Sequence, residues 1–315
     1  MPPDRPDRVR CCGVTLIELV VAIVLVGIIT AITFYFLYPV TQSTDLATRA
    51  ELTDIADNAL QRIGREARLA LPNSLRVTTS GGVKFVEFLP VRTAGRYRGD
   101  AGGVSSGSDC PADGVAAPDA DQLSFDGIVD TCFKTIGTVV DFATITTNDF
   151  LVFNNYGAGF TGQNAYATAP PSPASELNRR KISTVASEGT RVRFAFTSAN
   201  ALDRTLHDSP GRRFFVVIGN ATTALPEPVT YVCDPGAGTL TRRWAYTMVP
   251  TQPTSFSDGT QAQIAANVTS CDFDYVANVA PQIGLLTLRL TLSKAVSNTT
   301  ESVSLYHAVH VSNVP

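Results

Sequence analysis

Hydrophobic and polar positions follow two different patterns along this chain. From Val14 to Tyr38 the only charged residue is Glu18, and apolar side chains dominate the stretch. Residues 14–38 would form a helix of roughly 37 Å, enough to cross a bilayer core of about 30 Å. The pattern therefore predicts a transmembrane helix over 14–38, and Pro39 predicts a kink or local break directly after it.

A helical period continues beyond Pro39. Apolar side chains recur every three or four residues and charged side chains occupy most other positions, as in a helix with one apolar face. The apolar positions are Leu46, Ala50, Ile55, Ala59, Leu60, Ile63, Ala67 and Leu71. We expect residues 39–71 to continue the helix as an amphipathic element that packs on a globular domain, with Pro72 and Asn73 ending it.

After Pro72 the period changes to two. Residues 286–293 alternate leucine with polar side chains, as expected for a half-buried antiparallel strand. Other strand-like runs cover residues 83–89, 149–153, 191–196, 214–218, 229–233, 239–244 and 302–311. The turn residues of 234–238 predict a hairpin between 229–233 and 239–244. The predicted fold class is α+β, with a long N-terminal helix packed on an antiparallel β-rich domain over 72–315. That domain leaves room for two subdomains that divide near 167–175.

Composition excludes one class of partner. Only 17% of the 315 residues are charged and the net charge is −3, so no basic face supports nucleic-acid binding. The 23 Gly and 19 Pro fit a turn-rich β domain.

Six cysteines fall into two groups. Cys11 and Cys12 precede Gly13, whereas the remaining cysteines are Cys110, Cys132, Cys233 and Cys271. An even number in an exported chain fits two disulfides. Order and loop size favour Cys110–Cys132 and Cys233–Cys271, although four cysteines allow three pairings. Zinc is the weaker alternative, because the chain has no C-x-x-C pair and only three histidines.

Candidate catalytic and ligand motifs are weak. Residues 103–107 match G-x-S-x-G and residues 157–162 match G-x-G-x-x-G, but neither lies between a strand and a helix as its chemistry requires. The acidic residues of the 100–121 loop could offer oxygen ligands to Ca²⁺, yet they lack EF-hand spacing, and solvated loop acids are the simpler interpretation. No nucleophile, histidine and acid form a set. We expect no enzyme activity and no cofactor.

The charged leader and Glu18 carry the most specific signal. A carboxylate inside a lipid-facing helix costs about 2.5–3.5 kcal/mol and asks for a partner. Cleavage after Gly13 would create an amino group at Val14, which could neutralise Glu18 of a neighbouring copy. Arg5, Arg8 and Arg10 favour a cytoplasmic N-terminus. A cleavable secretory signal and a plain signal anchor are the alternatives, but the first would be shorter and the second explains neither Gly13 nor Glu18.

This run resembles the prepilin-type N-terminal methylation motif of the type IV pilin superfamily. The resemblance implies that a prepilin peptidase removes residues 1–13 after Gly13 and methylates the new N-terminus, usually phenylalanine and here Val14. It also implies that Glu18 sets axial register in a filament. The implied partners are other major and minor pilins, the peptidase, an inner-membrane assembly platform and the membrane itself. The implied location is a single pass through the inner membrane with a periplasmic C-terminal domain.

A softer resemblance concerns residues 70–77, 209–217 and 231–234. These segments are similar to the O-type minor pilins of mannose-sensitive haemagglutinin (MSHA) pilus biogenesis, which implies a subunit that helps to initiate or cap a filament. Two other functions stay open. One is a filament-tip adhesin that contacts a ligand through residues 99–122 and 154–175, and the other is a pseudopilin of a type II secretion system.

Overall fold

Helix α1 spans Leu16–Arg68 and is the longest helix of the chain, with 53 residues. The computed structural model describes residues 14–99, 110, 121–125, 129–168, 177–197, 200–280, 282–296 and 299–315, with 36–45 described by backbone only. The helix passes through Pro39 as one element, so the break predicted there is not found. Proline removes a single backbone hydrogen bond, and the regular turns on both sides keep the helical period.

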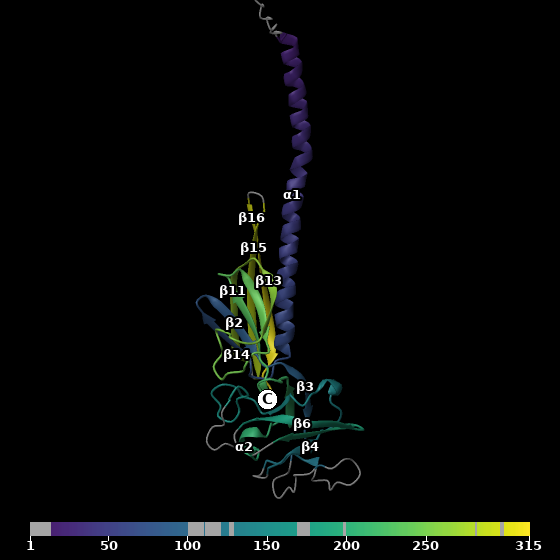
Figure 1. The fold of residues 1–315 in the computed structure, drawn as a ribbon, viewed down its shortest axis with the longest axis vertical. Coiled ribbons are helices and arrows are strands. Elements are labelled where there is room, and N and C mark those ends of the chain that lie inside the picture. The colour runs from purple at the N-terminus through teal and green to yellow at the C-terminus, as the bar shows by residue number, and fades with distance from the viewer. Residues whose placement is uncertain are drawn as a thin grey trace, which may run out of the picture. The chain divides into compact units, whose positions relative to one another are not determined.

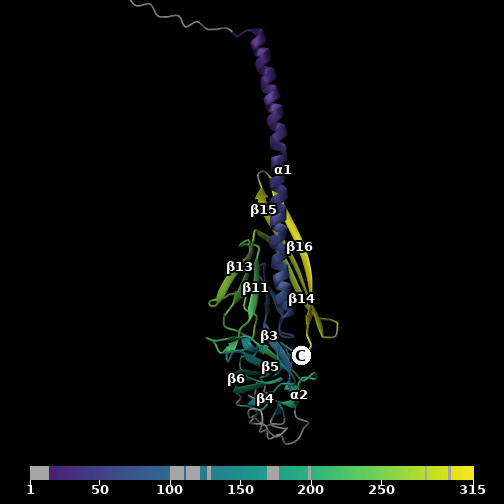
Figure 2. The same ribbon diagram turned by 90° about the vertical axis from the view of Figure 1, so that its right-hand side faces the viewer.

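The chain forms two compact units. One comprises residues 1–51 with 295–301, and the other comprises residues 52–294 with 302–315. The second unit contains the end of α1 and the sheets described below, and Figures 1 and 2 show the arrangement of these elements.

The part of α1 in the second unit buries one stripe of side chains. The stripe consists of Leu52, Ala56, Ala59, Leu60, Ile63 and Ala67, all at most 2% exposed. The predicted stripe was right at its later positions but wrong at Leu46, which is 70% exposed, and at Ala50. Leu52 and Ala56 are buried in their place. Apolar residues at intervals of three and four can form either of two overlapping helix faces, and packing against the sheet decides which face is buried. The helix ends at Arg68, three residues earlier than expected.

A five-stranded antiparallel sheet packs on this stripe, in the order β1-β2-β11-β12-β13. Its strands are β1 (Arg76–Ser80), β2 (Val83–Phe88), β11 (Val229–Asp234), β12 (Thr239–Trp244) and β13 (Thr260–Ala266). Gly81 and Gly82 both have positive φ and join β1 to β2 through a two-residue turn, which L side chains rarely adopt. The predicted hairpin between β11 and β12 is confirmed by the pairing of Asp234 with Thr239.

A three-stranded sheet, β14-β15-β16, shares the same core. It comprises β14 (Val268–Ala280), β15 (Ile283–Val296) and β16 (Thr299–Ser312). The leucine face predicted for residues 286–293 is confirmed, since Leu286, Leu288, Leu290 and Leu292 are all fully buried. The opposite face carries hydroxyl groups that bond across strands, such as Ser293 to Ser302 at 2.9 Å. The alternation therefore gives the sheet one buried apolar face and one exposed polar face.

A six-stranded antiparallel sheet, in the order β3-β8-β5-β6-β7-β4, holds a second core. Its strands are β3 (Val91–Arg96), β4 (Cys132–Lys134), β5 (Phe150–Phe153), β6 (Arg179–Glu188), β7 (Arg191–Thr197) and β8 (Arg213–Val217). Rings of Phe133, Phe194 and Phe214 lie 5.3–5.6 Å apart at its centre. The short elements η2 (Phe142–Thr144), α2 (Arg204–His207), β9 (Gly219–Asn220) and β10 (Leu225–Pro226) complete the described structure.

The strands of the six-stranded sheet lie between two neighbouring strands of the five-stranded sheet in the sequence. Strands β2 and β11 are neighbours in the five-stranded sheet, and residues 91–217 form the six-stranded sheet between them in sequence. A subdomain boundary near 167–175 gains no support from this pairing, because β5 and β6 on either side of it pair with each other. The fold is thus a long apolar helix followed by antiparallel sheets, as the sequence predicted.

Candidate functional site

The first turn of α1 carries the predicted assembly residues. Thr15 is its cap, because the Glu18 backbone N–H donates to the Thr15 hydroxyl at 3.3 Å and to the Thr15 carbonyl at 3.1 Å. Thr15 and Glu18 have the T-x-x-E spacing of a capping box, a signal that the sequence analysis did not use. A carboxylate at this end is also favoured by the helix dipole. Capping and the helix dipole therefore both favour a glutamate at position 18, whatever its role between chains.

Val14 and Glu18 are both exposed and lie at the same end of α1. Val14 is 71% exposed and precedes the helix. Gly13 and the rest of the leader over 1–13 lie outside the described residues. Both predicted partners of an amine–carboxylate pair are thus accessible to another chain.

The segment that follows is long and apolar enough to cross a membrane. It covers Leu16–Tyr35 and has a mean hydropathy of 2.7, and all of its side chains are exposed in this structure. Two threonine hydroxyl groups of this segment form hydrogen bonds within the helix: Thr30 donates to the Val26 carbonyl and Thr33 to the Ile29 carbonyl, each at 2.7 Å. Polar groups satisfied within the helix are what a hydrocarbon environment requires.

Both disulfides join the pairs that sequence order and loop size favoured. Cys110 and Cys132 have Cα atoms 5.7 Å apart, and Cys233 and Cys271 have Cα atoms 6.3 Å apart. The first bridge ties residue 110 to β4. The second joins β11 to β14 and so links the five-stranded sheet to the three-stranded sheet.

The acidic loop considered for Ca²⁺ is described at Asp121 alone among its aspartates. Asp121 forms ion pairs with Lys134 at 3.2 Å and with Arg191 at 2.9 Å, and Lys134 also pairs with Glu188 at 3.1 Å. Lys134 is 2% exposed, so these carboxylates neutralise a buried cation. Removing one partner of such a group typically costs 3–5 kcal/mol. Asp100, Asp109, Asp113 and Asp119 lie outside the described residues.

A buried ion pair on β1 and β2 was missed by the sequence analysis. Glu87 is fully buried and accepts from Arg76 at 2.9 Å. The Arg76 guanidinium also donates to the Val249 and Pro250 carbonyls and lies 3.7 Å from the centroid of the Tyr166 ring. Burial raises the pKa of Glu87 to about 7, and Arg76 opposes that rise. Counting back from the Gly81-Gly82 turn would have placed the two residues opposite each other.

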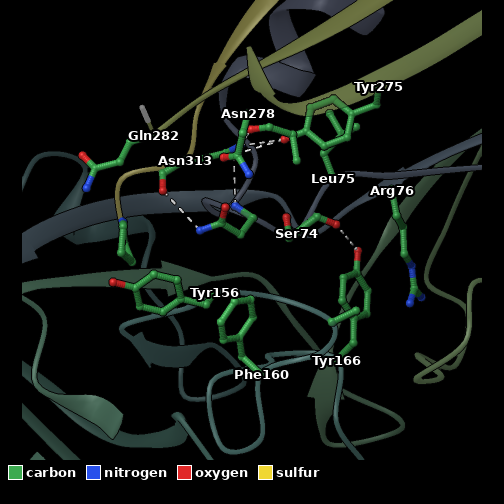
Figure 3. Close-up of a pocket in the computed structure, with 14 residues that line it drawn as sticks. Ser74, Leu75, Arg76, Tyr156, Phe160, Tyr166, Tyr275, Asn278, Gln282 and Asn313 are labelled. Carbon is green, nitrogen blue, oxygen red and sulfur yellow. Dashed lines mark hydrogen bonds between the residues drawn. The ribbon is translucent and has the colours of Figure 1, made fainter. Parts of the chain in front are cut away.

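A hollow of about 420 Å³ lies where the loop after α1, the β14–β15 turn and residues 156–166 meet. Figure 3 shows Tyr156, Phe160 and Tyr166 on one side of it and Asn278, Gln282 and Asn313 on the other. The C-terminus lies in the same region of the fold (Figure 1). Part of the segment 154–175 predicted to contact a ligand therefore does border a cavity, while 169–176 and most of 99–122 lie outside the described residues.

The G-x-G-x-x-G match at residues 157–162 forms part of this loop. Gly157, Gly159 and Gly162 all have positive φ, and residues 157–168 form turns, bends and irregular loop with no helix. A dinucleotide site would need these glycines to open a helix. Here they shape a turn instead.

Comparison with known proteins adds one finding. The model of the prokaryotic N-terminal methylation motif matches residues 8–34, which include Gly13, Val14 and Glu18. Neither the curated proteins nor the solved structures gave a match to this chain. The chain thus carries a type IV pilin-like N-terminal signal, which continues directly into the apolar half of α1.

Proposed function

We propose that this protein is a minor pilin or pseudopilin, a structural subunit that helps to initiate or cap a type IV filament of the MSHA kind. One observation carries the proposal. The methylation motif over residues 8–34 runs into a single helix, Leu16–Arg68, with Glu18 in its first turn. The match to the motif, an apolar segment long enough to cross a membrane and a carboxylate in the first helical turn therefore follow one another along the chain, which supports the proposal.

The proposed mechanism begins with cleavage of the peptide bond after Gly13 and methylation of the new Val14 amine. Helices of neighbouring subunits then pack side by side through Leu16–Tyr35. The Val14 ammonium of one copy pairs with the Glu18 carboxylate of the next, which offsets the cost of a charge in an apolar environment. Because only one axial offset brings the two groups together, the pair fixes the register of the subunits.

Orientation follows from the leader. Arginines of residues 1–13 would hold the N-terminus in the cytoplasm, so the sheets would fold in the periplasm, where disulfides persist. The two bridges, Cys110–Cys132 and Cys233–Cys271, are consistent with that compartment. The partners would be other pilins, a prepilin peptidase and the inner-membrane assembly platform, and the role would be structural and not enzymatic.

Mass spectrometry of the mature N-terminus tests this proposal. The chain is expressed with and without a prepilin peptidase, beside a Gly13→Leu variant and an Arg10→Lys control that keeps the leader's charge. We expect N-methylated Val14 at the N-terminus only with the peptidase, in the parent and in Arg10→Lys but not in Gly13→Leu. A retained leader, or cleavage beyond Tyr38, would contradict the proposal.

Deletion of the gene then separates the initiating role from the adhesin and the secretion role. An initiating subunit should be required for filaments to form. A tip adhesin should leave filaments that no longer attach, and a secretion pseudopilin should leave pili intact and stop export of secreted proteins.

A further inference from the structure

The hollow beside Tyr156 and Phe160 has the size and lining of a ligand site. Its volume of about 420 Å³ falls in the range of about 300–1,000 Å³ usual for small-molecule sites. All of its lining residues belong to the second compact unit. A second hollow of about 310 Å³ lies next to it, and the two share Tyr156 and Phe160.

The aromatic side of the hollow is exposed. Tyr156 is 37% exposed and Phe160 is 52% exposed, although large aromatic side chains gain most when they are buried. Their ring centroids are 5.4 Å apart and the planes are tilted by 41°. Two adjacent ring surfaces are therefore open to a molecule that enters either hollow.

The opposite side is polar, and its residue Asn313 is held in place by hydrogen bonds. Asn313 donates to the Ala277 carbonyl at 2.7 Å and to the Tyr275 hydroxyl at 2.9 Å. Asn73 donates to the Asn155 carbonyl at 2.8 Å, which connects the two walls. A Cβ added at Gly157 would lie 2.5 Å from the Asn73 carbonyl oxygen, so only glycine allows this close approach. A site fixed in advance loses little freedom when a ligand binds.

Backbone strain is concentrated around the two hollows. Asn73, Asn154 and Gln282 have φ of 59°, 44° and 60°, and they are three of the eight non-glycine residues with positive φ in the described chain. Each such residue costs of order 1–3 kcal/mol and persists where the surrounding structure enforces it, often at ligand sites. The concentration of strain here is independent of the cavity volume and points to the same place.

The charge of the lining excludes an anionic ligand. Arg76 is the one charged side chain among the described lining residues. Its guanidinium is already engaged by Glu87, by two backbone carbonyls and by the Tyr166 ring. The other side chains of this hollow are uncharged, among them the amides of Asn278 and Gln282 and the aromatic rings (Figure 3), and the charged side chain of the neighbouring hollow is the carboxylate Asp208.

We propose that this hollow binds a neutral saccharide. A sugar ring presents an apolar C–H face that fits the rings of Tyr156 and Phe160, and hydroxyl groups at its edge that fit the donors and acceptors of the Asn278 and Gln282 amides. The neighbouring hollow, across the same two rings, gives room for a second sugar unit.

Saccharide binding goes beyond the filament role and does not depend on it. The site is assembled by the second compact unit, so its presence requires neither cleavage after Gly13 nor the pairing of Glu18. Failure of one proposal would leave the other standing.

Saturation-transfer NMR on the full chain tests the site. The chain is kept in a detergent without a sugar head group and probed with the methyl glycosides of glucose, galactose, mannose and N-acetylglucosamine, and with glucuronate as an anionic probe. We expect at least one neutral glycoside to receive saturation with a Kd of about 1 mM, a weak affinity that suits one sugar ring. We expect no signal from glucuronate.

Substitutions assign the signal to the hollow. Phe160→Leu and Tyr156→Leu keep an apolar side chain and remove the flat ring, so each should weaken binding by about tenfold. Tyr306→Leu is the matched control, because Tyr306 is an exposed tyrosine, 60% accessible, on β16 outside this lining. It should bind as the parent does.

Three outcomes would overturn the proposal. They are the absence of saturation on all four neutral glycosides, stronger binding of glucuronate, and binding that survives both leucine substitutions. Thermal melting of each variant, compared with the parent, confirms that lost binding comes from the site and not from unfolding. If Tyr156→Leu unfolds, Phe160→Leu alone decides the result, since Phe160 is the more exposed ring.

Discussion

The two halves of α1 are one helix with two different environments. Apart from Glu18 and two threonines, Leu16–Tyr35 carries apolar or glycine residues on all sides, and none of the segment is buried within the chain. Residues 52–68 are amphipathic and bury one stripe against the sheets. A helix that is hydrophobic all round needs an apolar environment beyond its own fold, whereas an amphipathic helix is satisfied by one packed face. The same backbone geometry therefore carries a surface suited to an apolar environment at one end and a stripe buried in a core at the other.

This contrast predicts that substitutions in the two halves have separate effects. A change in the first half should alter assembly and leave the sheets folded. A change in the second half should lower the free energy of unfolding of the globular part.

Glu18→Ala is expected to have the largest effect. Without the carboxylate, the methylated amine of a neighbouring subunit loses its partner, so incorporation into sheared filaments should fall to near zero, while cleavage and membrane insertion persist. Quantitative immunoblotting of sheared filaments and of membranes measures both. Thr33→Val is the control, because its hydroxyl bonds only within the helix at 2.7 Å. Normal incorporation of Glu18→Ala would remove the proposed role of this residue.

Leu60→Ala should lower the free energy of unfolding by about 2–5 kcal/mol, because it leaves a cavity in the core around α1. Leu60 is 2% exposed, whereas Leu46, which is 70% exposed, provides a leucine on the same helix for comparison. Leu46→Ala should change stability by less than about 0.5 kcal/mol. Denaturant unfolding of the full chain, followed by near-ultraviolet circular dichroism, compares the two. Equal losses of unfolding free energy in the two variants would mean that the buried face of α1 has been assigned incorrectly.

Removing the bridge between the sheets with Cys233→Ala and Cys271→Ala should cost about 2–4 kcal/mol. The bridge closes a separation of 38 residues and joins β11 to β14. The same measurement on Cys110→Ala with Cys132→Ala, a separation of 22, should give a smaller loss. A larger loss from removing Cys110–Cys132 than from removing Cys233–Cys271 would contradict this order. It would mean that the first bridge stabilises the six-stranded sheet more than the second stabilises the core around α1.

The buried Glu87 should produce the smallest of these effects, and it should depend on pH. Its pKa is raised from 4.5 to about 7 by burial, so the folded protein binds this proton more tightly than the unfolded chain. The stability that the proton contributes is complete below pH 4.5 and is lost as pH rises through 7, by about 1–3 kcal/mol.

Glu87→Gln cannot titrate and should flatten that part of the profile. Melting temperatures of parent and variant between pH 4 and 8 test the difference, and Glu301→Gln, a change at a partly exposed glutamate on β16, is the control. Parallel profiles for the parent and Glu87→Gln would contradict the raised pKa.

Local periodicity predicted much of this fold. The leucine strand over 286–293, the β11–β12 hairpin and both disulfide pairs could be read from short stretches of sequence. The face of α1 that is buried could not be predicted, because apolar side chains at intervals of three and four residues allow two overlapping faces, and only packing on the sheets selects Leu52 and Ala56. The Arg76–Glu87 pair needed the register of the β1–β2 hairpin, which its two glycines imply.

The candidate sites divide in the same way. The proposed roles of Gly13, Val14 and Glu18 come from the sequence alone, since the methylation motif over 8–34 and a lone carboxylate in an apolar run are recognisable without any tertiary contact. It could not place the hollow beside Tyr156 and Phe160, whose walls come from segments near residues 73, 160, 280 and 313. The sequence by itself determined that a long N-terminal helix is followed by strands, and which face of the leucine strand is apolar, because these depend on neighbours a few positions away. Only the tertiary structure decided which strands adjoin, that Glu87 is buried and where a ligand could enter, because those depend on packing between residues far apart in the chain.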